Sequence, residues 1–148
     1  MASILIQNAD AIVTVDGDDR VLKNANLYAE DGVIRSVGSE APRADVVIDG
    51  RGSFVYPGLI NTHHHLYQTF TRNLPAVQRM ELFDWLRALY EIWRHMDEEW
   101  VYYGALTGMG DLVKYGCTTV MDHHYVFPGS APGYLDREFD AAQALGVR

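Results

Sequence analysis

Three consecutive histidines, His63, His64 and His65, have the clearest chemical potential in this chain. The 148 residues include only six histidines and a single cysteine, Cys117. One cysteine excludes an intrachain disulfide and any zinc site built from several cysteines, so histidine and carboxylate would have to hold a metal. Neutral imidazole is a common metal ligand, because it offers a ring-nitrogen lone pair. The first question is whether these side chains can reach one ion.

The segment before the histidines predicts a buried strand. Residues 54–61 are mostly apolar, in "FVYPGLIN", and their Pro-Gly pair fixes a sharp entry. If this is a barrel strand, its C-terminal end delivers the histidines to the face where barrel active sites lie. Alternation along the chain then places His63 and His65 on one side, where they can bind one ion, and His64 on the other, where it can form a supporting hydrogen bond. Alternatively, all three are hydrogen-bonding residues of a loop.

The first third of the chain predicts a small antiparallel β module. Short alternating segments such as "SILIQNAD" and "AIVTVDGD" are separated by turn residues. Asp31 and Gly32 lie between two such segments in "EDGV", which is the strongest short-range signal for a hairpin. We therefore expect residues 1–53 to form one module and residues 54–148 to belong to a second domain.

After residue 52 the pattern changes to strands alternating with helices. The expected elements are a strand at 54–61, a helix in "ELFDWLRALYEIWRH", a helix from Asp97 to Gly116, a strand in "CTTVMD" and a helix in "LDREFDAAQAL". Asp97 can cap free amides, and Gly116 accepts the left-handed conformation that ends a helix. The glycines at 104, 108 and 110 weaken the second helix, which indicates close packing against a neighbour. This order predicts βα units around a parallel sheet.

The fold class is therefore α/β, the N-terminal portion of a (β/α)8 TIM barrel with a small β module. Only about two βα units are visible, whereas a complete barrel needs about 250 residues. Two parallel strands alone would leave apolar edges and faces uncovered. We expect the chain to be a truncated part of a longer polypeptide; the alternative is that another chain completes it.

The composition of the chain favours a small molecule as its binding partner. The formal charge of −8 and the pI near 5.0 argue against nucleic-acid binding, which needs clustered lysine and arginine. No apolar run approaches the roughly 20 residues that span a bilayer, and the N-terminus lacks the pattern of a secretion signal. These observations exclude a membrane partner and favour a cytoplasmic protein.

Several motifs together resemble the N-terminal part of the amidohydrolase superfamily. "PGLINTHHHLYQ" matches a strand end of that superfamily with a His-x-His pair, and "EDGVIRSVG" precedes it in a β module. More narrowly, "NTHHHLYQTFTRNLP", "LFDWL" and "GCTTVMDHHYVFP" are similar to the 8-oxoguanine deaminase and hydroxyatrazine aminohydrolase branch. The resemblance implies that residues 1–53 are the first half of a β-sandwich beside the barrel.

The resemblance also implies roles for individual residues. His63 and His65 match the first two ligands of a Zn2+ ion, or of another divalent metal such as Fe2+. Gln68 matches a glutamine that faces the ring edge of the substrate in purine-deaminating relatives. The remaining metal ligands and the acid-base carboxylates are expected beyond Arg148, so no catalytic residue is assigned and the 148 residues alone are expected to be inactive.

Two further positions have open interpretations. His123 follows the second predicted barrel strand, where a substrate contact and a structural role in the loop are equally good explanations. Asp122 could orient a histidine, as carboxylates behind metal ligands often do. Arg72 could meet a polar substrate group, although pairing with a surface acid is the commoner role.

The expected function is metal-dependent hydrolytic deamination of an amino-substituted purine or similar heterocycle, 8-oxoguanine-like, with release of ammonia. The alternatives are another amidohydrolase reaction, on a triazine or a cyclic amide, and a non-catalytic fragment that binds a partner. The intact protein is expected to be a homo-oligomer with a small heterocyclic substrate.

Overall fold

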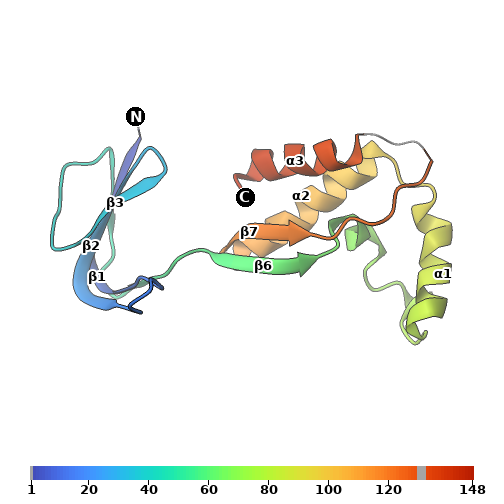
Figure 1. Cartoon of the computed structure of the whole chain (residues 1–148), viewed down its shortest axis with the longest axis horizontal. Coiled ribbons are helices and arrows are strands. Elements are labelled where there is room, and N and C mark those ends of the chain that lie inside the picture. Colours follow the sequence, from blue (N-terminus) through green and yellow to red (C-terminus); the bar gives the residue numbers. More distant parts are fainter. Residues whose placement is uncertain (1, 130–132) are drawn as a thin grey trace. The chain divides into compact units, whose positions relative to one another are not determined.

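The structure, a computed structural model, describes residues 2–129 and 133–148 (Figure 1). The chain forms two compact units, Met1–Pro57 and Gly58–Arg148. The domain division expected after residue 53 stays a prediction. Each unit is described by itself.

The first unit is a five-stranded sheet. Its strands are β1 (Ser3–Val13), β2 (Val21–Glu30), β3 (Val33–Gly38), β4 (Val46–Asp49) and β5 (Phe54–Val55). Strands β1, β2 and β3 form an antiparallel meander, as predicted, whereas β4 and β5 pair in parallel with β1. The expectation of a purely antiparallel module is therefore wrong for these two strands, because the chain returns along β1 in the same direction. Ala9, Ile12 and Ala25 form the buried core.

The predicted hairpin is confirmed between β2 and β3. Glu30 pairs with Val33 across a two-residue turn. Asp31 has φ of 50° and Gly32 has φ of 76°, so both central residues adopt the left-handed conformation. Such turns match the twist of the flanking strands, which explains why Asp-Gly is favoured there.

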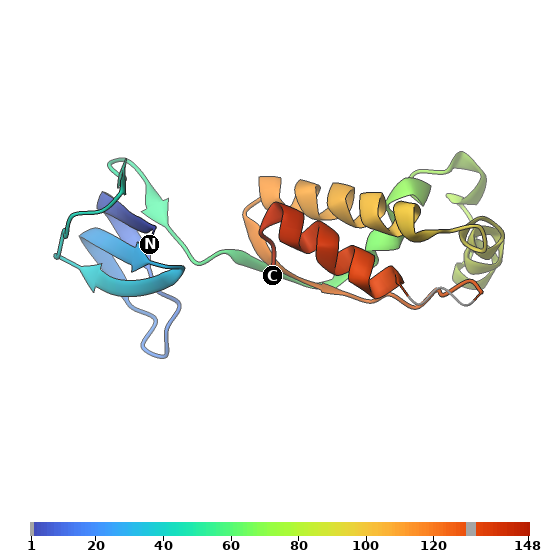
Figure 2. The ribbon, with the colours of Figure 1, turned by 90° about the horizontal axis from the view of Figure 1, so that it is seen from above.

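The second unit contains two parallel strands and the helices that connect them. Its elements are β6 (Leu59–His64), the short 3-10 helices η1 (Leu66–Thr71) and η2 (Pro75–Val77), α1 (Leu82–Trp93), α2 (Glu98–Lys114), β7 (Cys117–Asp122) and α3 (Tyr134–Leu145). Strand β6 pairs in parallel with β7, and α2 and α3 lie side by side along the strands (Figures 1 and 2). This is the predicted βα arrangement.

The single strand expected at residues 54–61 is instead two strands. Phe54 and Val55 pair with β1 in the first unit, and a new strand begins at Leu59. Between them, Pro57 has no N–H to donate to a sheet, which explains the interruption. Strand β6 then continues as far as His64 and carries the histidines at its C-terminal end.

Helix α2 confirms the predicted start and the predicted close packing. The Asp97 side chain accepts a hydrogen bond of 2.8 Å from the backbone N–H of Trp100. A Cβ atom at Gly104 would lie 3.3 Å from the Leu66 carbonyl oxygen, and one at Gly108 would lie 2.9 Å from the Leu66 side chain. Two of the three glycines therefore let α2 approach η1, whereas a Cβ at Gly110 would have no neighbour within 4 Å.

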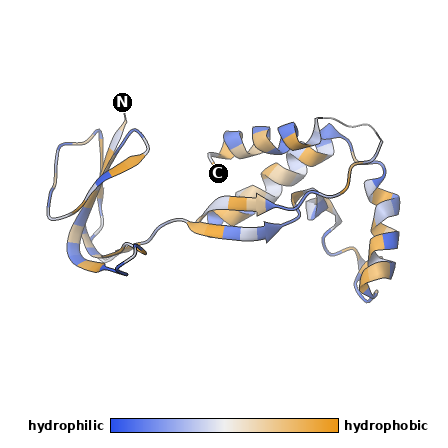
Figure 3. Cartoon of the chain, in the orientation of Figure 1, coloured by the Kyte–Doolittle hydropathy of each residue, from blue (hydrophilic) through white to orange (hydrophobic). Residues whose placement is uncertain are grey.

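Some of the large apolar side chains of α1 lie in the core, and others are exposed. Leu89 and Trp93 are fully buried and pack with Tyr67 of η1, and the Trp93 indole donates a hydrogen bond of 3.2 Å to Thr71. Tyr90 is 43% exposed. Hydrophobic and hydrophilic residues alternate along α1 and α3 in Figure 3, as expected for helices with one buried face.

A third segment continues the sheet beside β7. The backbone N–H of Arg148 donates to the Thr118 carbonyl at 3.0 Å, and the Val120 N–H donates to the Arg148 carbonyl at 2.8 Å. Successive backbone groups of a strand point to opposite edges, so Arg148 pairs with the edge of β7 that β6 leaves free. Across residues 2–129 and 133–148, none of the helices has the length and apolar composition needed to cross a membrane.

Candidate metal centre and substrate pocket

His63 and His65 meet at the C-terminal end of β6. Their Nε2 atoms lie 3.1 Å apart, and their rings meet edge to face with centroids separated by 4.9 Å. Two imidazoles that bind one zinc at about 2.0–2.1 Å have this nitrogen separation when the angle at the metal is roughly 100°. The pair therefore fits the first two positions of a tetrahedral site.

A backbone carbonyl fixes which ring nitrogen of His65 carries the hydrogen. Its Nδ1 atom lies 2.8 Å from the backbone oxygen of His123. Because a carbonyl only accepts hydrogen bonds, Nδ1 carries the proton, and in the neutral ring Nε2 holds the lone pair. This is the tautomer that a metal ligand needs, and the carbonyl holds the ring in the orientation that offers it.

His64 occupies a different environment from its two neighbours. Its Nδ1 atom accepts a hydrogen bond of 3.0 Å from the backbone N–H of His65, and its ring lies beside Gly108 of α2. Partial burial lowers the pKa of His64, with smaller contributions from the charges of His65 and Arg72. His64 therefore forms a supporting hydrogen bond with the backbone of His65, and its side chain also borders the hollow beside His63 and His65.

His123 has a structural role at the strand ends, and its contact with a substrate stays a prediction. Its backbone N–H donates to the His64 carbonyl at 2.8 Å, which joins the ends of the two strands. Its exposed ring stacks on His63 with centroids 4.1 Å apart. The backbone of His123 therefore positions the metal pair, while its side chain borders the same site.

Gln68 lies in the hollow that the histidines line. This hollow of about 270 Å³ is bordered by His63, His64, His65, Gln68, Thr69 and Arg72. The Gln68 amide nitrogen donates hydrogen bonds to the hydroxyls of Tyr67, at 3.1 Å, and Tyr125, at 3.0 Å. Arg72 forms an exposed ion pair with Asp111 at 3.9 Å, the commoner role for such an arginine.

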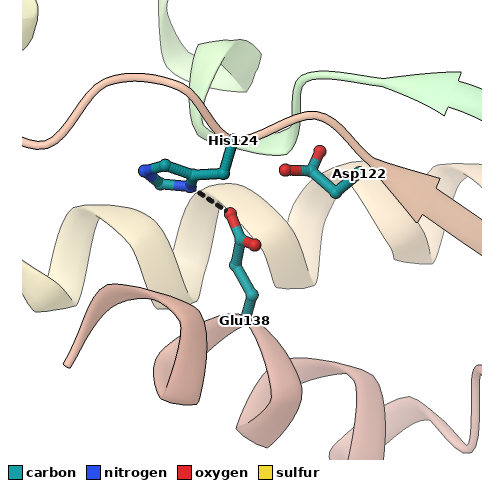
Figure 4. A group of neighbouring side chains, drawn as sticks. All are labelled: Asp122, His124 and Glu138. Carbon is teal, nitrogen blue, oxygen red and sulfur yellow. Dashed lines mark hydrogen bonds and ion pairs between the residues drawn. The ribbon is translucent and has the colours of Figure 1, made fainter.

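A second group of titratable side chains consists of Asp122 of β7, His124 of the segment after it and Glu138 of α3 (Figure 4). Nδ1 of His124 lies 2.5 Å from Glu138 of α3, and Nε2 lies 2.9 Å from the Val126 carbonyl oxygen. Burial acts to lower the pKa of His124, but the hydrogen bond and charge of Glu138 outweigh it, so this pKa is raised. His124 and Glu138 therefore form a buried ion pair.

Asp122 connects this pair to the segment that carries Gln68. Its Oδ1 atom accepts a hydrogen bond of 2.6 Å from the backbone N–H of Leu66, the first residue of η1. Its buried Oδ2 atom has no hydrogen-bond partner among the residues that the structure describes. Burial, followed by the charge of Glu138, raises the pKa of Asp122 to about 6.

The ligand atoms of Asp122, His124 and Glu138 lie within 4.8 Å of one another, a separation that a metal ion could bridge. However, both ring nitrogens of His124 already have hydrogen-bond partners, and a ring that donates from both has no lone pair for a metal. Asp122, His124 and Glu138 therefore fit a network of interacting charges better than a metal site. Sequence analysis missed Glu138, although a carboxylate on the same helical face as Tyr134 and Ala141 was a usable signal.

The fold and site together define a class of protein. Parallel strands with helical connections present paired imidazoles at their C-terminal end, where (β/α)8 barrel enzymes have their active sites. Residues 54–148 match the amidohydrolase family, and the chain belongs to that family. Its fold is that of the N-terminal part of the family's TIM barrel.

Curated relatives of the chain hydrolyse carbon–nitrogen bonds. It is 36% identical to hydroxydechloroatrazine ethylaminohydrolase of Pseudomonas sp. (strain ADP), an alignment that covers all of this chain and 34% of the relative. It is also 36% identical to 8-oxoguanine deaminase of Pseudomonas aeruginosa, with coverage of 100% and 33%. The chain thus spans about a third of the length of these relatives.

Solved structures of related enzymes have the same fold over the part that this chain covers. Atrazine chlorohydrolase from Arthrobacter aurescens TC1, in complex with zinc, superposes with a TM-score of 0.89 at 31% identity over 98% of this chain and 34% of the other.

Proposed function

We propose that the protein is a metal-dependent aminohydrolase that removes ammonia from an amino-substituted purine or a similar heterocycle such as 8-oxoguanine. The observation that carries the proposal is the 3.1 Å separation of His63 Nε2 and His65 Nε2 in the hollow that also holds Gln68. An 8-oxoguanine deaminase among the relatives supports the substrate class.

The residues of this chain would supply two ligands and a substrate contact. A divalent ion, most suitably zinc, supplies Lewis acidity and brings the pKa of water to about 7. His63 and His65 hold that ion through Nε2, and the His123 carbonyl keeps the second ring in the required tautomer. Gln68 orients the ring of the heterocycle through its amide. His123, which follows the neighbouring strand β7, borders the substrate.

The test uses the protein expressed from the complete reading frame that contains these residues. Zinc would be measured by elemental analysis and ammonia release by a coupled assay with 8-oxoguanine, guanine and isocytosine. We expect about one zinc per protein and turnover of at least one of these bases. Removal of zinc by a chelator should abolish turnover and re-addition should restore it, whereas a metal-free protein with unchanged activity would overturn the proposal.

A second candidate is hydrolysis of a substituted triazine at the same site. It is favoured by the likeness to the ethylaminohydrolase and to the zinc-containing chlorohydrolase. The same protein would be assayed with an ethylamino-substituted hydroxytriazine and with a cyclic amide. A ratio of kcat/KM that favours the triazine would replace the purine proposal, and a protein that binds no metal and turns over no substrate would favour a non-catalytic fragment.

The proposal also covers the cellular compartment, the partners and the oligomeric state of the protein. We propose that the intact protein is a cytoplasmic homo-oligomer that binds neither nucleic acid nor membrane. Its formal charge of −8 argues against binding to nucleic acid. Light scattering after size-exclusion chromatography measures the oligomeric state, and fractionation of the source cells measures the compartment.

A further inference from the structure

Three hydrogen bonds hold the end of β6 against two consecutive residues at the end of β7. The Asp122 carboxylate accepts from the Leu66 N–H at 2.6 Å, and the His123 N–H donates to the His64 carbonyl at 2.8 Å. The His123 carbonyl accepts the Nδ1–H of His65, also at 2.8 Å. The metal pair therefore takes its orientation from residues 122 and 123, and it depends on whatever fixes those residues in turn.

His124 is the next residue of this segment, and its side chain is held at both ring nitrogens. Nδ1 lies 2.5 Å from Oε1 of Glu138, and Nε2 lies 2.9 Å from the Val126 carbonyl oxygen. Since a carbonyl only accepts, Nε2 donates to it. Only 2% of the His124 side chain and 10% of the Glu138 side chain are exposed. Two directional contacts, one to α3 and one within the segment, therefore fix the position of the ring (Figure 4).

The surroundings of the His124 ring do not by themselves require a polar side chain. The ring packs on Tyr67, Phe127 and Tyr134, with centroids 4.8, 4.7 and 5.9 Å away. A phenylalanine would make the same packing contacts, whereas a buried ion pair costs desolvation of both partners. The ion pair with Glu138 therefore brings a cost that packing alone does not explain. What it adds over an apolar pair is the direction of its hydrogen bonds.

We propose that Glu138 of α3 is a positioning residue for the metal pair. By fixing His124 it keeps the adjoining carbonyl, that of His123, in place to accept from Nδ1 of His65. The effect passes along one stretch of backbone, from residue 124 to residue 123, and then through one hydrogen bond. The inference rests on the proposed function, because it concerns the ion that the histidine pair would hold.

Zinc affinity and metal geometry test this inference in the protein from the complete reading frame. The dissociation constant of Zn2+ would be measured by competition with a chromophoric chelator. The visible absorption of the Co2+-substituted protein reports the geometry of the ligands, and ammonia release from 8-oxoguanine, guanine and isocytosine would be measured alongside. The variants are Glu138→Gln and the double variant His124→Phe with Glu138→Leu.

Two controls separate positioning from charge and from stability. Asp140→Asn makes a matched change, because it removes a carboxylate from the exposed face of the same helix. Leu89→Ala leaves a cavity at a fully buried position of α1 and so lowers stability without touching the strand ends. Both controls should bind Zn2+ as tightly as the unmodified protein.

We expect Glu138→Gln to bind Zn2+ at least about tenfold more weakly, the usual result of losing a group that holds a metal ligand in place. The double variant replaces the buried pair with apolar side chains of similar volume, and such replacements often preserve or raise stability. It should therefore fold, yet bind Zn2+ as weakly as Glu138→Gln and show a changed Co2+ spectrum. The double variant decides the matter if Glu138→Gln does not fold.

The outcomes separate this inference from the function beneath it. A folded double variant with the zinc affinity and Co2+ spectrum of the unmodified protein would overturn the inference. An equal loss of affinity in Leu89→Ala would also overturn it, because the effect would then follow from stability alone. If the unmodified protein binds Zn2+ but releases no ammonia, the proposed reaction fails while the comparison of variants still decides the inference. An unmodified protein that binds no Zn2+ overturns both.

Discussion

The Nδ1 atom of His65 lies 2.8 Å from the backbone oxygen of His123, so the candidate metal pair depends on two strand ends rather than one. The His123 N–H in turn donates to the His64 carbonyl at 2.8 Å. These two hydrogen bonds join β6 to the segment after β7 and fix the tautomer of one candidate metal ligand. The pairing of neighbouring parallel strands is therefore part of the chemistry of the site.

The first prediction concerns metal content. His63→Ala or His65→Ala should reduce bound zinc in the protein from the complete reading frame by at least about tenfold, because each removes a nitrogen donor from the ion. His95→Ala, at an exposed histidine after α1, is the control and should retain zinc. The measurement is elemental analysis after dialysis against a weak chelator. Equal zinc in all three variants would show that the metal is held elsewhere.

The second prediction concerns the glycines of α2. Gly108→Ala places a Cβ 2.9 Å from the Leu66 side chain and 3.0 Å from the Thr69 hydroxyl, and such overpacking costs about 1–3 kcal/mol. Gly110→Ala is the matched control, since the added Cβ meets no atom within 4 Å and gains up to about 1 kcal/mol in helix propensity. The melting temperature of Gly110→Ala should therefore be higher than that of the unmodified protein, and the melting temperature of Gly108→Ala should be lower. Displacement of η1 should also lower turnover in Gly108→Ala, and equal melting temperatures for the two variants would contradict this packing.

The third prediction concerns the buried ion pair of His124 and Glu138, whose side chains are only 2% and 10% exposed. Glu138→Gln leaves His124 without its anion, and breaking a buried pair in this way costs about 3–5 kcal/mol. Because Glu138 raises the folded pKa of His124 against the effect of burial, its stabilisation is complete below the unfolded pKa of about 6.5 and is lost as the pH rises through the folded pKa.

Urea unfolding at pH 6 and pH 9 checks this dependence. The loss in Glu138→Gln should be larger at pH 6. The control is Glu91→Gln, which removes an exposed ion pair with Arg94 and should change stability by less than about 1 kcal/mol at either pH. A loss in Glu138→Gln that does not vary with pH would mean that His124 is neutral in the folded protein.

The fourth prediction concerns Asp122, whose pKa burial raises from 3.8 to about 6. The folded state takes up a proton before the unfolded state does, so ionised Asp122 destabilises the fold above pH 6 and this penalty disappears as the pH falls toward 4. Asp122→Asn keeps an acceptor for the Leu66 N–H and carries no charge. It should therefore be more stable than the unmodified protein at pH 7, with the difference decreasing toward pH 4.

Thermal unfolding across this pH range measures that difference. Asp111→Asn is the control, since it makes the same change at an exposed carboxylate. Lower stability of Asp122→Asn at pH 7 would indicate that the ionised carboxylate has a partner in the complete protein.

Much of the site was predictable because its signals are local. The His-x-His spacing follows from the two-residue period of an extended chain, and it indicated that His63 and His65 share a side while His64 does not. The Asp31–Gly32 turn, the Asp97 cap and the left-handed Gly116 were predictable for the same reason, since each depends on the backbone of a few adjacent residues. The close packing behind Gly104 and Gly108 was also visible as an excess of glycine in a helix.

Local signals could not predict the features that depend on separate parts of the chain. The parallel pairing of β4 and β5 with β1 depends on which distant strand is available as a partner.

The sequence by itself determined the paired histidines, their spacing and the family, because residue identity and short-range geometry are sufficient for these. Only the tertiary structure decided the His65 tautomer, the hydrogen-bond partners of Gln68 and the burial of Glu138. Each requires a hydrogen-bond partner or a packed surface from a segment many residues away: the His123 carbonyl, the Tyr125 hydroxyl and the His124 ring.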